Sequence, residues 1–307
     1  MDRLLANNTS AHVVVHHDYA RSWLDLAAFN PRHVDVLRHT RAIRWGTYDQ
    51  LLAILRSLEW IEAHLDYRWV VFISGQDYPL RPPVEIQELL LASGVDAFVE
   101  KPRHVHYRFR DDEGGRDFWS ARYFYAYYPL PKLARTLPAR WAKALRNAEV
   151  LLRSHQPFVF FWMLPRDENT MIGFRRARHP FGDDFTCYVG SDSFTYSRAC
   201  VRTVLDFARR RPDVLRYYRR TIHPSESFFN SIVKSTPSLR VHEDNFRFDR
   251  FPDPGTGHPD ILRLGDLETL LRSRKHFARK FDVTVDEEIL NALDREIDAA
   301  VATRSRP

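Results

Sequence analysis

The chain has 307 residues, 44% of them hydrophobic, which is enough to bury the core of one α/β enzyme or of two halves that share a cleft. No run of about 18 apolar residues predicts a membrane span, and the first residues lack the apolar segment of a signal peptide, so we expect a cytoplasmic protein. Cys187 and Cys200 are the two cysteines; they argue against a disulfide framework and are expected to be buried. The net charge of +6 favours anionic partners: nucleotide phosphates, nucleic acid or anionic lipid, the last as a peripheral contact at the inner membrane face.

Strands are predicted to alternate with helices in the first part of the chain. Thr47 is expected to begin a helix, with Gln50 at the spacing of a capping box. The continuous apolar run 69–73 is typical of a strand that is buried on both faces. The alternation predicts a mainly parallel sheet flanked by helices. The other elements expected here are strands at 12–16, 35–37 and 97–99 and a helix at 84–92.

The rest of the chain is less regular and rich in aromatic residues. We expect most of these in the core, although aromatic platforms also suit sugar rings. Helices are expected at about 197–209 and 225–233. A last helix is expected from Thr284, where Glu287 stands at the spacing of a capping box.

Two polar segments, His17-Asp18 and the run 74–78, directly follow predicted apolar strands. Because ligands of open α/β sheets bind beyond the carboxyl ends of the strands, both segments are expected at the ligand edge. Asp77 is suited to accept hydrogen bonds from substrate hydroxyls. The alternative is that Asp77 only forms the turn before Pro79.

Glu226 follows Pro224 and Ser225, which mark the start of a helix. In the first turn, the partial positive charge of the helix end favours the ionised carboxylate. Such a carboxylate at a cleft can accept the proton of a sugar hydroxyl as that hydroxyl attacks. The alternative is a glutamate that complements the helix dipole and has no catalytic role.

Arg279 and Lys280 stand between Phe277 and Phe281. Fixed cations can stabilise a departing diphosphate in place of a metal ion, and the arginine fork fits phosphate oxygens. The alternative is a surface basic patch.

No Asp-x-Asp pattern follows a predicted strand. The pairs Asp111-Asp112 and Asp183-Asp184 lie in polar loops. We therefore expect chemistry that needs no metal ion and no other cofactor.

In their order, these segments resemble the core-2/I-branching β-1,6-N-acetylglucosaminyltransferase and peptide O-xylosyltransferase family. The similarity runs from about residue 12 to residue 282. The matching motifs are His17-Asp18, Trp45-Gly46, SGQDYPL at 74–80, GSDSF at 190–194 followed by Ser197-Arg198, PSESFF at 224–229, NFR at 245–247 and FARKFD at 277–282.

The resemblance implies a GT-A-like, Rossmann-type fold with a more irregular acceptor side, and inverting, metal-independent transfer from a UDP-sugar. It implies that Glu226 is the catalytic base. The nucleotide and diphosphate contacts that it implies are His17, Asp18, Arg279 and Lys280, with Arg247, Arg250 or Arg263 as the further arginine that some members use. The implied donor and acceptor cleft comprises Trp45, Gly46, Ser74, Gln76, Asp77, Tyr78, Ser191 and Asp192.

The resemblance also implies one catalytic domain at 1–283, with a nucleotide-binding half at about 1–100 and an acceptor and catalytic half at about 101–283. A C-terminal helix and short tail at 284–307 are expected to pack on it. The family has a strand before its first helix, whereas here the sequence begins at Met1, inside that helix.

The partners expected are a UDP-sugar donor and a glycan or lipid-linked saccharide acceptor, and no nucleic acid. Relatives transfer N-acetylglucosamine, xylose or glucuronate, and the sequence does not choose among them. The basic runs and the aromatic residues motivate an alternative, a non-catalytic protein that binds anionic glycan or nucleic acid. A GT-A transferase that uses another nucleotide sugar and a family member without activity are further alternatives.

Overall fold

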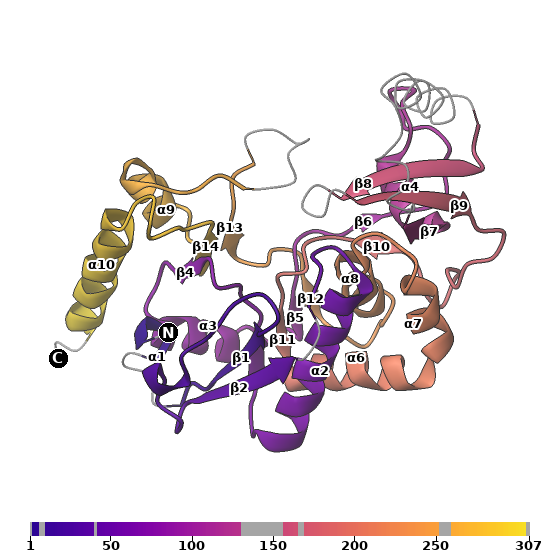
Figure 1. Cartoon of the computed structure of the whole chain (residues 1–307). Helices are drawn as coiled ribbons and strands as arrows, with labels where there is room; N and C mark the ends of the chain where they lie inside the picture. Colours follow the sequence, from indigo (N-terminus) through magenta and orange to yellow (C-terminus); the bar gives the residue numbers. More distant parts are fainter. Residues whose placement is uncertain are drawn as a thin grey trace.

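The computed structural model describes residues 2–5, 10–39, 42–129, 156–164, 169–251 and 259–304. Within these ranges the chain is a mixed α/β protein with nine α-helices (Figure 1). The helices are α1 (Asp2–Leu5), α2 (Tyr48–His64), α3 (Pro83–Ala92), α4 (Phe118–Phe124), α6 (Arg198–Arg210), α7 (Pro212–Tyr218), α8 (Pro224–Lys234), α9 (Leu267–Arg272) and α10 (Glu288–Arg304), with 3-10 turns η1 (Leu26–Ala28) and η3 (Leu264–Asp266). In the part of the chain described, no helix combines the length and the apolar character needed to cross a membrane.

The central sheet has four strands in the order β12-β5-β11-β3. Their bounds are Val241–His242, Ala97–Phe98, Thr195–Ser197 and Trp69–Val71. β12 is parallel to β5, but β11 is antiparallel to both of its neighbours. Beside this sheet, β1 (Val13–Asp18) and β2 (Val34–His39) form a parallel pair.

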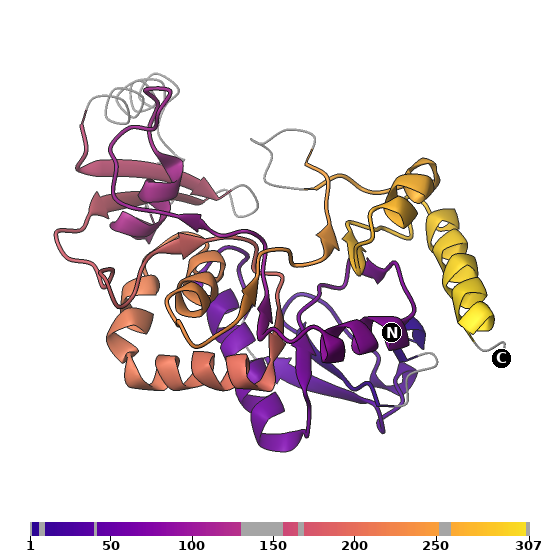
Figure 2. The same ribbon diagram turned by 180° about the vertical axis from the view of Figure 1, so that it is seen from behind.

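Successive residues of the central strands face opposite sides, as the period of a strand requires. Val70 and Ala97 pack in the largest apolar cluster with α2, α6 and α8, whereas Trp69, Val71 and Phe98 pack with α3. The expectation of a sheet flanked by helices is therefore confirmed, and Figures 1 and 2 show the two groups of helices on opposite sides of the sheet.

The expectation of a mainly parallel sheet is wrong for the described residues, because most strand pairings there are antiparallel. β11 enters the central sheet between β3 and β5 after a long excursion of the chain, and it runs in the opposite direction to both. The strand at 69–71 is half-buried rather than fully buried on both faces.

Two smaller units lie at opposite ends of the molecule in both views (Figures 1 and 2). One is the antiparallel sheet β7-β9-β8 with α4. The other is the sheet β13-β14-β4 with α9 and α10. The strands are β7 (Tyr125–Pro129), β9 (Asn169–Arg175), β8 (Val159–Leu164), β13 (Arg247–Phe248), β14 (Phe277–Arg279) and β4 (Asp77–Pro79), and a further antiparallel pair is β10 (Tyr188–Val189) with β6 (Arg103–His104).

Helix α6 shows why the expected helices form. Ser197 caps it by accepting a hydrogen bond from the backbone N of Cys200 at 3.2 Å. Its apolar residues recur at helical spacing and are buried in the main core; they are Cys200, Val201, Val204, Leu205 and Ala208. Cys187 is also free and buried, so both cysteines lie as expected.

The two expected capping boxes do not form. Thr47 precedes α2, but its hydroxyl donates to the carbonyl of Arg44 at 2.7 Å, and the Gln50 side chain accepts from the N–H of Gly46 at 2.9 Å. The last helix begins at Glu288 rather than Thr284. The hydroxyl of Thr284 donates to the carboxylate of Asp282 instead of capping a helix. The expected apolar face of that helix is confirmed at Ile289, Leu293 and Ile297, which are buried.

Candidate active site

Glu226 lies in the first turn of α8, as expected. His223 precedes this helix with a left-handed backbone (φ 48°), and Pro224 occupies the first helical position, where its missing N–H costs nothing. The N–H of His223 donates to the carbonyl of Gly46 at 2.9 Å, and the ring of Trp45 meets the His223 ring edge-to-face at 4.5 Å. A Cβ on Gly46 would lie 2.7 Å from Cε1 of His223, and φ is +71° there, so this position requires glycine. The Trp45-Gly46 pair therefore holds the start of α8.

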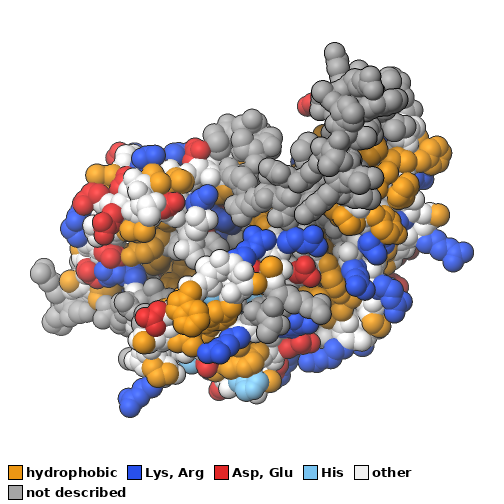
Figure 3. All heavy atoms as spheres, viewed as in Figure 1, with side chains coloured by type: hydrophobic (Ala, Val, Ile, Leu, Met, Phe, Trp, Pro, Cys, Tyr) orange, Lys and Arg blue, Asp and Glu red, His pale blue; other side chains and the backbone are white. Residues whose placement is uncertain are grey.

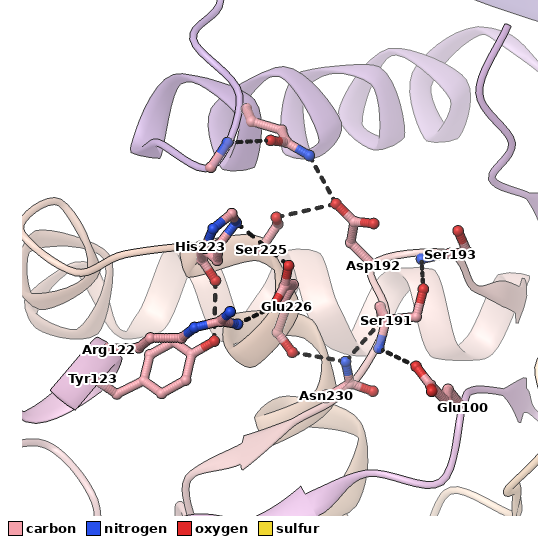
Figure 4. A network of polar contacts seen from close by, with 12 residues as sticks. Glu100, Arg122, Tyr123, Ser191, Asp192, Ser193, His223, Ser225, Glu226 and Asn230 are labelled. Atoms are coloured by element: carbon pink, nitrogen blue, oxygen red, sulfur yellow. Dashed lines mark hydrogen bonds and ion pairs between the residues drawn. The ribbon is translucent and has the colours of Figure 1, made fainter. Parts of the chain in front are cut away.

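The carboxylate of Glu226 lies between Arg122 and His223 (Figure 4). Arg122, on α4, donates from Nη1 to Oε2 at 2.7 Å, and Nδ1 of His223 lies 3.4 Å from Oε1. The guanidinium of Arg122 in turn sits over the rings of Trp119 and Trp162, at 4.7 and 5.5 Å from their centroids. The contacts with these two rings thus orient the Arg122 guanidinium, which in turn holds Glu226.

Burial raises the pKa of Glu226 to about 7, against the opposing effect of the Arg122 charge. The charges of Asp192 and Glu100 raise this pKa further. The helix end was expected to favour the ionised carboxylate; burial acts in the opposite direction and is the largest effect on this pKa. A carboxyl group with a pKa near neutrality is well matched to general-base catalysis.

His223 is not a charged partner of Glu226. Burial and the nearby Arg122 charge lower the pKa of the imidazole to about 3, so the ring is neutral at pH 7. Among the described residues, the charged partner of the Glu226 carboxylate is therefore Arg122.

Asp192 and Ser191 belong to a loop that packs against α8. Oδ2 of Asp192 accepts hydrogen bonds from Gln50 at 2.7 Å and from the hydroxyl of Ser225 at 3.3 Å. The carbonyl of Ser191 accepts from the side chain of Asn230 at 3.0 Å, and its N–H donates to a carboxylate oxygen of Glu100 at 2.8 Å. The loop therefore places a second partly buried carboxylate beside the start of α8 (Figure 4).

Arg279 belongs to the same electrostatic group as Glu226. Burial raises the pKa of Asp192, and the Arg279 charge is the main effect that opposes this rise; the Asp192 charge acts in turn on Glu226. Nε of Arg279 lies 3.4 Å from Oδ1 of Asp77, to which it is opposite in the β14–β4 pairing. Lys280 follows at the end of β14 and is partly exposed. Asp192 is thus the group whose charge interacts both with Arg279 and with Glu226.

The side chains of the segment 74–78 point to different parts of the protein. Asp77 is almost fully buried and accepts from the N–H of Ser74 at 2.6 Å, which agrees with its alternative interpretation as a turn-forming residue. The Ser74 hydroxyl also accepts from the N–H of Gln76 at 3.3 Å. The hydroxyl of Tyr78 donates to Asp294 on α10 at 2.7 Å, so this side chain is directed to the C-terminal helix and not to Glu226.

Arg247 lies in the interior, which differs from its expected place at an open diphosphate site. Its guanidinium donates to the carbonyl of Asn245 at 3.0 Å and stacks over Phe277 at 4.5 Å. Burial lowers its pKa to about 10. Arg247 therefore supports β14, the strand that carries Arg279.

His17 and Asp18 order the chain beyond β1. Asp18 accepts from the N–H groups of Ala20 at 3.1 Å and Ile43 at 2.8 Å, and Nε2 of His17 lies 2.9 Å from the carbonyl of Ser22. Among the described residues, no hydrogen bond or ion pair joins them to Glu226, so their nucleotide role stays a prediction.

Sequence reasoning missed Arg122, Gln50 and Glu100. Arg122 lies in an aromatic-rich stretch with no motif around it, and 104 residues separate it from Glu226. Gln50 was assigned to a cap, whereas its side chain joins the Gly46 backbone to Asp192. His223 lies directly before Pro224, and this position at the start of α8 was the signal available for it.

Lys and Arg side chains spread across the middle of the face seen in Figure 3, beside atoms that are not described. Within the ranges that the structure describes, no group of three or more His, Cys, Asp or Glu side chains is placed to hold a metal ion. Comparison with protein-family models and with curated protein sequences gives no match.

Proposed function

We propose that this chain is an inverting, metal-independent glycosyltransferase of GT-A-like fold that transfers a sugar from a UDP-sugar to a hydroxyl of a saccharide acceptor. The observation that carries the proposal is Glu226, a partly buried carboxyl with a pKa of about 7 that is held by Arg122 and lies near Asp192, whose own pKa responds to the Arg279 charge. The order of the sequence motifs, which resembles the family named above, supports the choice of a UDP-sugar.

The proposed reaction is a single displacement. The acceptor hydroxyl gives its proton to Glu226, and the hydroxyl oxygen forms a bond to the anomeric carbon. The bond from that carbon to the β-phosphate oxygen breaks on the opposite face, and its electron pair leaves with UDP. Arg279 and Lys280 stabilise the charge that develops on the diphosphate.

The partly buried position of Glu226 suits this step. Proton transfer is favoured when the pKa of the base is near the working pH, and the contact with Arg122 fixes the carboxylate before the acceptor arrives. Trp45 and Gly46 act indirectly, since they hold His223 and so the first turn of α8.

The decisive test is Glu226→Gln. After a screen of UDP-N-acetylglucosamine, UDP-xylose and UDP-glucuronate for hydrolysis, the variant is expected to turn over the active donor about 10²–10⁴-fold more slowly, while UDP binding by calorimetry is retained. Glu268→Gln, an exposed site on α9, is the matched control. A Glu226→Gln protein with full turnover would show that the base is another residue.

The cationic side is tested separately. Arg279→Ala is expected to weaken UDP binding, whereas Arg272→Ala removes an equal charge from an exposed position on α9 and is expected to have no effect. Activity is expected to survive excess EDTA. Complete loss of activity with EDTA and its recovery with manganese would refute metal independence.

The alternative of a basic binding protein predicts a different result. Its ligand would bind with an affinity that falls steeply with salt, independently of Glu226 and of UDP. Calorimetry of Glu226→Gln and Arg279→Ala at two salt concentrations separates the transferase from the basic binding protein.

A further inference from the structure

A cavity of about 230 Å³ lies beside the start of α2 and the turn that leads into α8. It is open to the surface. Its lining combines arginine, tyrosine and threonine side chains with a few apolar ones: Arg44, Gly46, Thr47, Tyr48, Asp49, Tyr127, Pro129, Met171, Arg219, Arg220, Thr221 and Ile222.

The charge of this cavity is unbalanced. Three arginines, Arg44, Arg219 and Arg220, line it together with one acidic residue, Asp49. About half of the other arginines of the described ranges have a carboxylate within 4 Å, such as Arg122 with Glu226. No ion pair involves the three cavity arginines in the part of the chain that the structure describes.

Neighbouring groups respond to this excess of cations. Arg220 stacks on the ring of Tyr128 at 4.4 Å, a contact that orients the guanidinium without neutralising it. Burial lowers the pKa of Arg176, and the Arg220 charge lowers it further. The Arg219 charge likewise opposes the rise of the pKa of Tyr48 that burial causes. Cations gathered in this way, which outnumber the one carboxylate of the lining, that of Asp49, favour an anionic ligand.

The cavity adjoins the proposed catalytic centre. Gly46 lines it, and the carbonyl of Gly46 accepts the hydrogen bond from the N–H of His223. Ile222, another lining residue, directly precedes His223, whose ring lies 3.4 Å from Glu226. The lining of the cavity and the proposed general base therefore both adjoin His223.

We propose that this cavity binds an anionic group, a carboxylate or phosphate, on one residue of the saccharide acceptor. The substrate class is then an acidic glycan, and this assignment rests on the proposed transferase function. The cavity is smaller than the roughly 300–1,000 Å³ of pockets for drug-sized ligands, which fits one residue of a longer chain. Arginine forks match both oxyanions, and the tyrosine and threonine side chains supply further hydrogen-bonding groups.

The test measures binding to the full chain without turnover. The probes are a tetramer of galacturonate, a tetramer of glycerol phosphate and neutral maltotetraose, each titrated by calorimetry at low and moderate salt. The two anionic arms separate a uronate from a phosphate source. The wild type is expected to bind at least one anionic probe and to bind maltotetraose at least about 10-fold more weakly.

The variant for this site is the triple substitution Arg44→Ala, Arg219→Ala and Arg220→Ala. It is expected to lose at least about 10-fold in affinity for the anionic probe. The control replaces three exposed arginines of α6 by alanine and so makes the same change in net charge; these are Arg202, Arg209 and Arg210. The corresponding triple lysine variant keeps the charge and is expected to retain most of the binding, which guards against a folding defect.

The outcomes separate this inference from the function on which it rests. Selective anion binding that the cavity variant loses and Glu226→Gln keeps supports the site, even if no UDP-sugar is turned over. Equal binding of anionic and neutral probes, or equal loss in the α6 control, overturns the site. Transfer with no preference for acidic over neutral acceptors also overturns it, and leaves the transferase function intact.

Discussion

Replacement of Arg122 by glutamine is expected to raise the pKa of Glu226 and to move the acidic limb of the pH–rate profile upward. In the native protein, burial brings this pKa to about 7, and the Arg122 charge is the largest effect that lowers it. Without that charge, the ionised carboxylate loses its main stabilising partner, so protonation becomes easier and the group stays protonated to a higher pH.

The size of the effect follows from the 2.7 Å contact between Nη1 of Arg122 and Oε2 of Glu226. A hydrogen bond to a charged group contributes about 1.5–3 kcal/mol. One pKa unit corresponds to about 1.4 kcal/mol, so the pKa of Glu226 is expected to rise by about one to two, to about 8–9. Turnover at pH 7 then falls about 5- to 50-fold, because a smaller share of the carboxyl is ionised.

Two measurements check this expectation. The first is the pH dependence of kcat/KM with the active donor, in which the variant regains much of its rate at high pH. The second is ¹³C NMR titration of the Glu226 carboxyl, assigned by its disappearance in Glu226→Gln, which needs no substrate. Arg122→Lys keeps a cation and is expected to move the midpoint less.

A merely structural role of Arg122 predicts another pattern. Activity would then fall by the same factor at every pH, and the NMR midpoint of Glu226 would stay near 7. That result would refute the electrostatic reasoning even if the variant were inactive.

Three further predictions concern stability, measured by chemical denaturation. Gly46→Ala places a Cβ 2.7 Å from Cε1 of His223 at a positive φ, so a loss of about 1–3 kcal/mol is expected; an unchanged midpoint would contradict this close packing. Ser197→Ala removes the N-cap of α6 and is expected to cost about 1 kcal/mol, with Ser197→Thr as the control that keeps the hydroxyl. Phe228→Ala empties a fully buried position and is expected to cost about 3–5 kcal/mol, whereas the exposed Phe158→Ala is expected to have little effect.

The local elements could be predicted because their signals lie within a few residues. The apolar periodicity of α6 and the Pro224-Ser225 start of α8 are examples, and both helices lie within a residue or two of their expected bounds. The direction of β11 could not be predicted, because it depends on where a strand returns after a long excursion. Its short sequence is compatible with either direction.

The site shows the same division. Glu226 and Arg279 were found from their local segments, and the structure relates them through Asp192. The pKa of Glu226 could not be predicted, because burial and the contact with Arg122 arise only from tertiary packing. For Gln50, the local spacing indicated a capping box with Thr47, whereas its side chain makes a long-range hydrogen bond to Asp192 that the sequence does not show.

Helix α8 has one buried side chain after another behind Glu226, from Ser227 to Val233. Such a helix cannot shift without disrupting the main core, so the proposed base has a fixed position from which substrates of different shape must be approached. Differences in acceptor preference would therefore have to come from residues outside α8, such as those that line the cavity beside α2. A saturation mutagenesis scan is expected to find α8 the least tolerant segment and the cavity lining more permissive.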